Sequence, residues 1–554
     1  MSEMANGGSR DNSIRLHPPI DIFQFRVSSG LLELIPQGYF WYLAAMFASA
    51  SLWAALARPC RQSGTFRTVL TQSRFTATFS TSIPKATQKI NCNVLPKTQT
   101  TSNVWKTRLF SPGKNCGLFR SYSITQKSSS IVSRPLNSRF FSANSNTAEF
   151  KELPILTPPS VGFWLLGTTA LIYAVIVVGG VTRLTESGLS ITEWKPVSGV
   201  IPPITDTEWE EEFTKYKATP EFKLLNSNFT VDDFKRIFYM EWGHRVLGRF
   251  IGLAFVGPLA YFALRKKIPP SSTKHFAGLA VLLGLQGALG WFMVKSGLED
   301  SIMTTPGAVP RVSHYRLAAH LGAAFLLYGA MFISGHNIIR DYKFVRKGVW
   351  SGQEGSAFEK ILKQPLVRSF RTKAWALAGL VFITAISGAF VAGLDAGLLY
   401  NEFPLMGGRL APPADELMNP SYATLPDKSD LWWRNIFENP TTVQFNHRVL
   451  AMTTYAATGA MYWLTRNPAM RSILPAATIR VATGAFAVAN LQVLLGISTL
   501  LYLVPVPLAA AHQAGSVALL SMALTLALTL RRPGVVAQLY RRRALMAANK
   551  PPSL

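Results

Sequence analysis

The chain has 554 residues, of which 48% are hydrophobic and only 15% are charged, and its formal net charge is +27. This composition favours a polytopic membrane protein with a long polar appendage. The charge does not indicate nucleic-acid binding, because about half of the excess lies in residues 1–148 and much of the rest lies in alternate loops between apolar segments. No nucleic-acid partner is therefore expected.

The N-terminal segment has the composition of a mitochondrial transit peptide. Residues 46–148 contain no Asp or Glu and are rich in Ser, Thr and Arg. We predict that residues 1–141 are a mostly disordered targeting region, with 1–45 as an upstream extension. Cleavage is expected after Phe141, at an Arg-Phe-Phe-Ser run similar to a processing site. The alternative is that the uncharged residues 39–57 form a transmembrane helix.

All cysteines fall within this targeting region. They are Cys60, Cys92 and Cys116, so the predicted mature chain has none. Disulfide, zinc-thiolate and thiol-nucleophile chemistry are thereby excluded from the rest of the protein.

Eight apolar runs are long enough to cross a bilayer as helices. They lie near residues 161–181, 246–264, 276–294, 317–336, 374–393, 446–465, 479–503 and 508–530.

The loops between these runs alternate in charge. Basic residues prevail in loops 265–275 and 337–373, whereas acidic residues prevail in loops 182–243 and 394–445. The excess of Lys and Arg marks the side on which a loop stays during insertion. We therefore expect a multi-pass protein of the mitochondrial inner membrane, with both termini in the matrix and the acidic loops in the intermembrane space.

The two halves of the chain repeat. The run from Gly179 to Pro203 is echoed by the run from Gly388 to Pro413, and Leu285-Gln286 with Gly290 is echoed by Leu491-Gln492 with Gly496. The predicted fold is an all-α polytopic membrane protein, with eight transmembrane helices as two tandem four-helix bundles related by a pseudo-twofold axis along the membrane normal. The predicted divisions are an N-terminal half (142–350), a matrix linker (351–373), a C-terminal half (374–532) and a matrix tail (533–554).

Four histidines recur in this duplicated pattern. His244 and His447 open the second span of each half, and His320 and His512 open the fourth. An ionisable side chain in a membrane helix is costly, so it indicates function, and imidazole is a common ligand of haem iron. Entering from one side at similar depth, the two histidines of each half are expected to face each other and ligate one macrocycle. For any single histidine the alternative is an interfacial polar group.

The remaining histidines have no repeat partner and are assigned no function. They are His17 in the N-terminal segment, His275 and His314, expected in loops, and His336, expected near a helix end.

One difference separates the two halves. Glu241 precedes His244 by three residues, whereas the equivalent residue before His447 is Gln444. One titratable pocket and one neutral pocket suggest one reactive site and one structural or electron-transfer site. The alternative for Glu241 is a carboxylate stabilised by the helix dipole.

Arginines accompany the histidines. Arg245 and Arg448 directly follow a histidine in each half, and guanidinium groups are suited to haem propionates. Arg183 is a weaker candidate for the same role. Snorkelling of these side chains to the membrane interface is the alternative.

These motifs resemble those of haem A synthase, in its mitochondrial branch, over residues 150–532. The resemblance is carried by Glu-Trp-Gly-His-Arg at 241–245, by Gly-Val-Thr-Arg-Leu-Thr-Glu-Ser-Gly-Leu-Ser at 180–190, by Trp-Lys-Pro at 194–196 and by the four histidines.

The resemblance implies an oxidoreductase that oxidises the C8 methyl group of haem O to a formyl group and so makes haem A for cytochrome c oxidase. It implies haem O between His244 and His320, a permanent haem b between His447 and His512, and Glu241 as the catalytic carboxylate. Its implied partners are the lipid bilayer, haem O synthase for substrate handover and a ferredoxin-type electron donor, with homo-oligomerisation left open.

One departure from the family and two alternative functions bear on this interpretation. Bacterial relatives carry a cysteine pair in an extracellular loop that this chain lacks, which puts a thiol-dependent step in doubt. A dihaem b-type electron-transfer protein explains four histidines equally well but predicts two symmetric pockets. A transporter explains the tandem repeat but has no need of the histidines.

Overall fold

The computed structural model describes residues 153–196, 198–304 and 308–548. The predicted targeting region, its cleavage position and the three cysteines lie outside the described residues. The long helices are α3 (Pro159–Leu184), α6 (Val231–Leu264), α7 (Pro270–Lys295), α9 (His314–Lys347), α11 (Pro365–Gly393), α14 (Pro440–Leu464), α16 (Ala476–Leu501) and α17 (Val506–Thr529). Each predicted span lies inside one of these helices or overruns its end by at most two residues.

Short elements connect the long helices. They are α4 (Asp206–Lys217), α5 (Pro220–Leu224), α8 (Ser301–Thr304), the paired strands β1 (Val349–Trp350) and β2 (Gln353–Glu354), α10 (Gly355–Lys363), η1 (Ala396–Leu398), α12 (Ala414–Leu417), η2 (Pro420–Tyr422), α13 (Leu431–Glu438), α15 (Pro468–Ile473) and α18 (Val535–Ala548).

The start of α6 is set by its capping residues. The Thr230 side chain accepts a hydrogen bond from the Asp233 amide, and the Asp233 carboxylate accepts one from the Thr230 amide, which forms a capping box. The helix therefore begins well before the apolar run at 246–264. Glu241 and His244 consequently lie on one continuous helix, about one turn apart.

Among the described residues, seven helices are long and apolar enough to cross a membrane, namely α3, α6, α7, α9, α11, α16 and α17. The chain is thus a polytopic, predominantly helical membrane protein. The predicted eighth span, α14, has 25 residues but is not among the seven. Polar residues such as Asn446, Thr453 and Thr454 lower its mean hydropathy.

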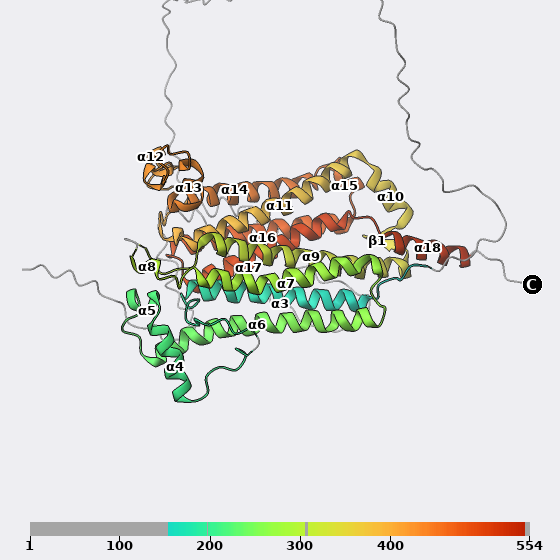
Figure 1. The fold of residues 1–554 in the computed structure, drawn as a ribbon. Coiled ribbons are helices and arrows are strands. Elements are labelled where there is room, and N and C mark those ends of the chain that lie inside the picture. The colour runs from blue at the N-terminus through green and yellow to red at the C-terminus, as the bar shows by residue number, and fades with distance from the viewer. Residues whose placement is uncertain (1–152, 197, 305–307, 549–554) are drawn as a thin grey trace, which may run out of the picture. The chain divides into compact units, whose positions relative to one another are not determined.

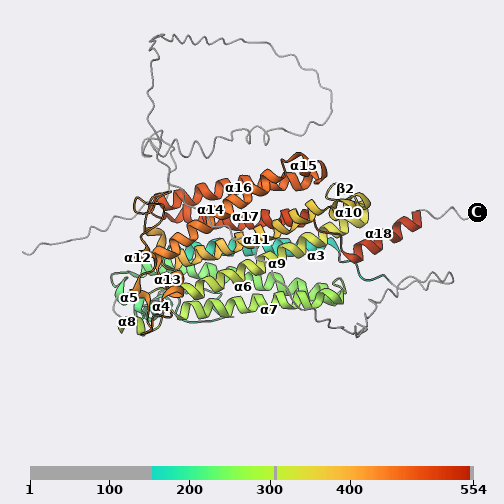
Figure 2. The same cartoon turned by 90° about the horizontal axis from the view of Figure 1, so that it is seen from above.

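The long helices pack in two sets (Figure 1). In the first set α3 contacts α6 and α9, and α7 contacts the same two helices. In the second set α11 contacts α14 and α17, and α16 contacts the same two helices. The sets meet where α9 packs on α11 and where α17 packs on α3 and α9, with α6 and α7 on one side and α14 and α16 on the other (Figure 2).

Hydrogen bonds join the sets as well. The Tyr173 hydroxyl donates to the Ala514 carbonyl at 2.7 Å, and the Tyr328 hydroxyl lies 2.6 Å from the Ser521 hydroxyl. Both tyrosines lie in the first set and both partners lie on α17, so this helix connects the halves.

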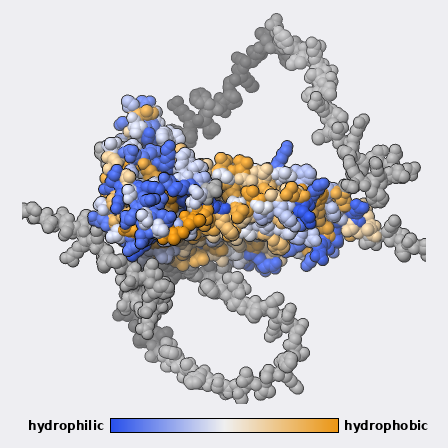
Figure 3. All heavy atoms as spheres, turned by 60° about the horizontal axis from the view of Figure 1, so that its bottom comes forward, coloured by the Kyte–Doolittle hydropathy of each residue, from blue (hydrophilic) through white to orange (hydrophobic). Residues whose placement is uncertain are grey.

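The short elements gather at the two ends of the long helices (Figures 1 and 2). We call the end with α4, α5, α8, α12 and α13 the acidic end, and the end with α10, α15 and α18 the basic end. Hydrophobic side chains are prominent over the middle of the helices, between hydrophilic ends (Figure 3). This distribution suits helices whose middle sections are embedded in a bilayer.

Candidate functional site

The four repeated histidines all lie toward the acidic end of the long helices. His320, His447 and His512 lie about two turns after the starts of α9, α14 and α17. His244 lies deeper along its helix, because α6 extends outward to Val231. The prediction that His244 lies at the start of its helix is therefore wrong.

Each histidine ring lies against a glycine of a neighbouring helix. A β-carbon placed on the glycine would approach the ring Cε1 atom to 2.8 Å for Gly179 and His244, 3.3 Å for Gly290 and His320, 3.2 Å for Gly388 and His447, and 2.8 Å for Gly496 and His512. These four glycines are the ones that the sequence repeats at matching positions. The repeat signalled them, but only the structure shows that they provide room for the imidazoles.

The ring nitrogens differ in their surroundings. Nδ1 of His244, His320 and His512 is buried without a hydrogen-bond partner, whereas Nδ1 of His447 lies 2.7 Å from the Ser387 hydroxyl. Within the described residues, Nε2 of these four rings makes no hydrogen bond to the protein. None of these four Nε2 atoms is fully buried. Nε2 is therefore the accessible nitrogen of each ring, and it is one of the two nitrogens through which a neutral imidazole binds metals.

The histidines pair within each half. His244 lies close enough to His320 to interact with it electrostatically, and His447 is related to His512 in the same way. The described residues contain no group of three or more His, Cys, Asp and Glu side chains that could hold a metal ion. A protein supplies haem iron with one or two side-chain ligands, and each half contains a pair of histidines that would serve. The paired imidazoles of each half, with Nε2 free of a protein partner, are a donor set that fits haem iron.

Matched glutamines support the second histidine of each pair. Gln286 Nε2 donates to the His320 carbonyl at 3.1 Å, and Gln492 Nε2 donates to the His512 carbonyl at 2.9 Å. These glutamines precede Gly290 and Gly496 by about one turn, so the same helix face holds both the backbone and the ring of its histidine.

Glu241 is buried, with 3% of its surface exposed, and is surrounded by donors. Its Oε2 accepts from the Ser190 hydroxyl at 2.7 Å and from the Ile191 amide at 2.9 Å. Its Oε1 accepts from Arg245 Nη2 at 2.7 Å and from Arg245 Nε at 3.0 Å. A charge-assisted network of this kind fixes the position of the carboxylate.

The segment after α3 crosses α6 and covers this carboxylate. Arg245 donates to the carbonyls of Ile191 and Glu193 at 2.9 and 3.0 Å, and Arg249 donates to those of Lys195 and Pro196 at 2.7 and 3.0 Å. The Trp-Lys-Pro motif at 194–196 is therefore held to α6 through its backbone. Most of the N–H groups of Arg245 are occupied by these contacts.

The other half has the opposite polarity at the matching position. Gln444 is also 3% exposed, but its Nε2 donates to the carbonyls of Ala396 and Leu399. Its Oε1 lies 3.4 Å from Arg448 Nη2. Loop donors thus face Glu241, whereas loop acceptors face Gln444, so each residue type suits its own loop.

Arg183 joins the two halves at the acidic end. Its Nη2 lies 2.7 Å from Asp395 Oδ1, and Arg311 Nη1 lies 2.9 Å from Asp395 Oδ2. Arg183 and Arg311 belong to the first half of the chain and Asp395 to the second. The Nε atom of Arg183 is buried without a partner.

The three other described histidines lie in helices. His275 lies in α7 and His314 is the first residue of α9, so the prediction of loops is wrong, because both helices begin before their apolar runs. His336 lies well inside α9, since that helix continues to Lys347. His275 Nε2 lies 2.9 Å from the Ser334 hydroxyl, and His336 Nδ1 lies 3.2 Å from the Phe332 carbonyl. His314 Nε2 is buried without a hydrogen-bond partner.

Sequence reasoning missed Glu221. This carboxyl, in α5 at the acidic end, is 3% exposed, and its Oε2 is buried without a partner. Burial raises the pKa of Glu221 to about 8, and the nearby carboxylates of Glu241 and Glu186 act in the same direction. No periodicity or repeat marks this residue, so nothing in the sequence distinguished it from the exposed acids of its loop.

Comparison with known proteins identifies the family. The model of the cytochrome oxidase assembly protein family COX15-CtaA matches residues 162–524. The heme A synthase–mitochondrial ferredoxin fusion protein of Schizosaccharomyces pombe is 52% identical over 371 residues, which are 66% of this chain and 59% of the relative. Heme A synthase COX15 of Saccharomyces cerevisiae is 46% identical over 404 residues, 73% of this chain and 81% of the relative.

A human relative gives the same result. Heme A synthase COX15 of Homo sapiens is 42% identical over 407 residues, which are 72% of this chain and 91% of the relative. The matched region includes all four histidines and Glu241. The chain therefore belongs to the COX15-CtaA family of cytochrome oxidase assembly proteins.

Proposed function

We propose that this protein is a haem A synthase, an oxidoreductase that makes haem A from haem O for cytochrome c oxidase. Its support is the family match over residues 162–524, together with relatives of that name at 42–52% identity. One structural observation carries the assignment. Each half has a pair of histidines packed against glycines, and a buried carboxylate accompanies one pair whereas a buried amide accompanies the other.

The first half holds the substrate and the second half the permanent cofactor. His244 and His320 bind the iron of haem O, and His447 and His512 bind that of haem b. Bound haem b supplies a one-electron redox centre. The neutral Gln444 beside His447 supports the assignment of the second half as the unreactive cofactor site, because an amide does not exchange protons at physiological pH.

Glu241 is the catalytic carboxylate. Its position one turn from His244 on α6 supports this, since it holds a negative charge and a proton-accepting oxygen beside the substrate ligand. Arg245, Ser190 and Ile191 orient it. The reaction converts the C8 methyl group of haem O into a formyl group, a four-electron oxidation that requires an external oxidant as well as the electron donor.

Propionate binding is assigned to Arg448 and Arg183, with a smaller part for Arg245. The Nε atoms of Arg448 and Arg183 are buried without a partner, so each guanidinium has an unused donor. Arg245 has at most one N–H left after its contacts with Glu241, Ile191 and Glu193.

The proposed arrangement in the membrane is based on the contacts between the long helices. We assign α14 as the eighth span, because it occupies the place in the second set that α6 occupies in the first. The halves 142–350 and 374–532, with a linker at 351–373 and a tail at 533–554, are then tandem four-helix bundles with a pseudo-twofold axis along the membrane normal. Residues 1–141 direct the chain to mitochondria.

The protein lies in the inner membrane with both termini in the matrix. The charge of the loops supports this orientation. A ferredoxin-type protein is the proposed electron donor, because the fission yeast relative is named as a fusion with a mitochondrial ferredoxin. Haem O synthase is the proposed source of the substrate.

Haem analysis tests the function. The full chain is expressed in cells that make haem O but lack their own haem A synthase, and the pigments extracted from the cells and from purified protein are separated. We expect haem A in the cells and haems B, O and A with the protein. Haem B alone, with haem O unconverted, would favour the dihaem electron carrier and overturn the assignment.

A further inference from the structure

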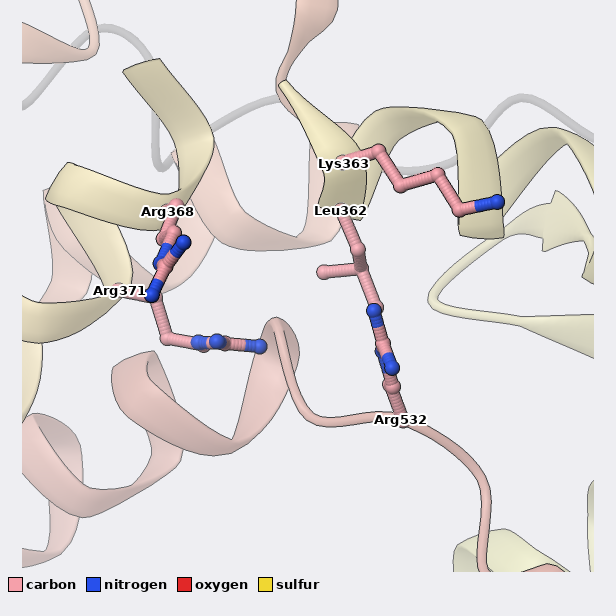
Figure 4. Close-up of a pocket in the computed structure, with 5 residues that line it drawn as sticks. All are labelled: Leu362, Lys363, Arg368, Arg371 and Arg532. Atoms are coloured by element: carbon pink, nitrogen blue, oxygen red, sulfur yellow. The ribbon is translucent and has the colours of Figure 1, made fainter. Parts of the chain in front are cut away.

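A basic cavity lies at the end of the molecule opposite the histidines (Figure 4). It has a volume of about 420 Å³ and is lined by Leu362, Lys363, Arg368, Arg371 and Arg532. Arg368 and Arg371 come from the first turns of α11, and Arg532 comes from the segment between α17 and α18. Elements far apart in sequence thus bring three guanidinium groups to one cavity.

These guanidinium groups have no anion of their own. Within the described ranges, Arg368, Arg371 and Arg532 have no side-chain hydrogen bond or ion pair. Asp341 binds Arg531 at 3.0 Å, and Glu359 lies 3.7 Å from Lys363, the one lining cation that has an acidic partner. Arg368 and Arg532 are exposed and therefore screened by water, and an anion bound among the three guanidinium groups would further lower their mutual repulsion.

The backbone at the start of α11 also favours a bound anion. Arg368 and Arg371 lie near the N-terminus of the 29-residue helix α11, where the macrodipole is positive and cations are unfavourable. The residue before the helix, Gln364, makes no capping hydrogen bond through its side chain. A phosphate oxygen would complement both the arginines and this helix end.

The cavity also lies at the edge of the apolar zone. The apolar run of α11 at 374–393 follows the arginines, and two large apolar side chains of this helix, Leu366 and Trp375, are 53% and 42% exposed. Acyl chains would cover such side chains, whereas a soluble phosphate would leave them in water. Basic pockets beside transmembrane helices are suited to anionic lipid headgroups.

We propose that this cavity binds the phosphate headgroup of an anionic phospholipid in the leaflet that faces the basic end. The guanidinium groups of Arg368, Arg371 and Arg532 hold the phosphate, and the exposed apolar side chains of α11 contact the acyl chains. The site is independent of the haem assignment, and it anchors the junction between α11 and the α17–α18 segment.

The test measures thermal unfolding of the purified full chain in a neutral detergent. Diphosphatidylglycerol, phosphatidylcholine and inorganic phosphate are added in separate titrations at equal phosphorus. The variant R368Q/R532Q is compared with R471Q/R480Q, which removes two charges from exposed arginines of α15 and α16 at the same end. The single variants R368Q and R532Q serve if the double variant does not fold.

We expect diphosphatidylglycerol to raise the Tm of the wild type and of R471Q/R480Q at the same concentrations, and phosphatidylcholine to have little effect. R368Q/R532Q should need at least about tenfold more diphosphatidylglycerol for the same rise, as expected for loss of two charge-assisted contacts. An equal rise in R368Q/R532Q would overturn the site. An equal rise with inorganic phosphate would show a free-anion site and overturn the lipid assignment.

Discussion

Gly179 of α3 lies directly against the imidazole of His244 of α6, so that a β-carbon at position 179 would come within 2.8 Å of the ring Cε1 atom. The same relationship joins Gly496 to His512 at 2.8 Å, in the other half of the chain. Contacts under 3.0 Å force a neighbour to move, and here the neighbour is the proposed iron ligand. Glycine is needed at these positions for the space that it leaves.

The variants Gly179→Ala and Gly496→Ala should each displace one histidine and lower the haem content of their own half. Gly290→Ala and Gly388→Ala should have smaller effects, because their contacts are 3.3 and 3.2 Å. Haem content per protein, from the absorption spectrum of purified variants, measures this. Gly287→Ala is the control, since nothing lies within 4 Å of a β-carbon there. Equal haem content in all five variants would remove the steric role of the glycines.

The C-terminal histidines should hold the stable cofactor. His447→Ala and His512→Ala each remove one of the two nitrogens proposed to bind haem b, so most of the haem b should be lost. Reduced-minus-oxidised spectra of the purified proteins report this loss. His275→Ala, whose ring contacts only the Ser334 hydroxyl by hydrogen bonding, should retain the spectrum. An unchanged haem b signal in both C-terminal variants would refute the assignment.

Glu221 should make stability depend on pH. Burial raises its folded-state pKa from 4.5 to about 8, so the folded protein binds more protons than the unfolded chain in this range. Stability should therefore fall as the pH rises from about 4.5 to about 8, and change little from this group above pH 8. Glu221→Gln should flatten the dependence of Tm on pH, whereas Glu211→Gln, at an exposed position, should leave it intact. The same slope in both variants would exclude Glu221 as the source.

The two acidic loops should face the intermembrane space. Protease added to mitochondria with a ruptured outer membrane should cut within 182–243 or 394–445, while the basic end stays protected. Antibodies against each end of the protein would identify the fragments. Cleavage of these loops only after rupture of the inner membrane would reverse the topology.

Much of the helical scaffold could be predicted because it depends on local apolar runs. Each run at 161–181, 276–294 and 374–393 became a helix, since backbone in a bilayer must satisfy its own hydrogen bonds. The beginnings of the helices were less predictable. Polar caps and prolines set them, and for α6 the Thr230 capping box adds several turns beyond the apolar run.

The candidate site could be predicted only in part from the sequence. The repeat indicated the histidines and glycines, but the contact between Gly179 and His244 joins two helices and has no signature in either one alone. The Glu241–Gln444 difference was visible, yet its cause was not. That cause is the polarity of two distant loops, one presenting Ser190 and Ile191 as donors and the other presenting backbone carbonyls.

The loops also explain why Gln444→Glu should not create a second reactive site. A carboxylate at 444 would face the carbonyls of Ala396 and Leu399, which are acceptors. The expected outcome is reduced stability and no additional haem A. A lowered Tm with unchanged haem A per folded protein, measured in parallel, would agree with this expectation, while increased haem A would contradict it.

The ratio of haem A to haem O in cells that carry Glu241→Gln tests the central claim most directly. Glutamine removes the charge and places an amide against donors, so Ser190→Ala, which removes one donor but keeps the carboxylate, controls for disturbance of the loop. We predict that Glu241→Gln keeps haem b but accumulates haem O or a partly oxidised haem, with haem A reduced at least about tenfold, while Ser190→Ala still makes haem A. A normal haem A to haem O ratio in Glu241→Gln would contradict the catalytic role of this carboxylate.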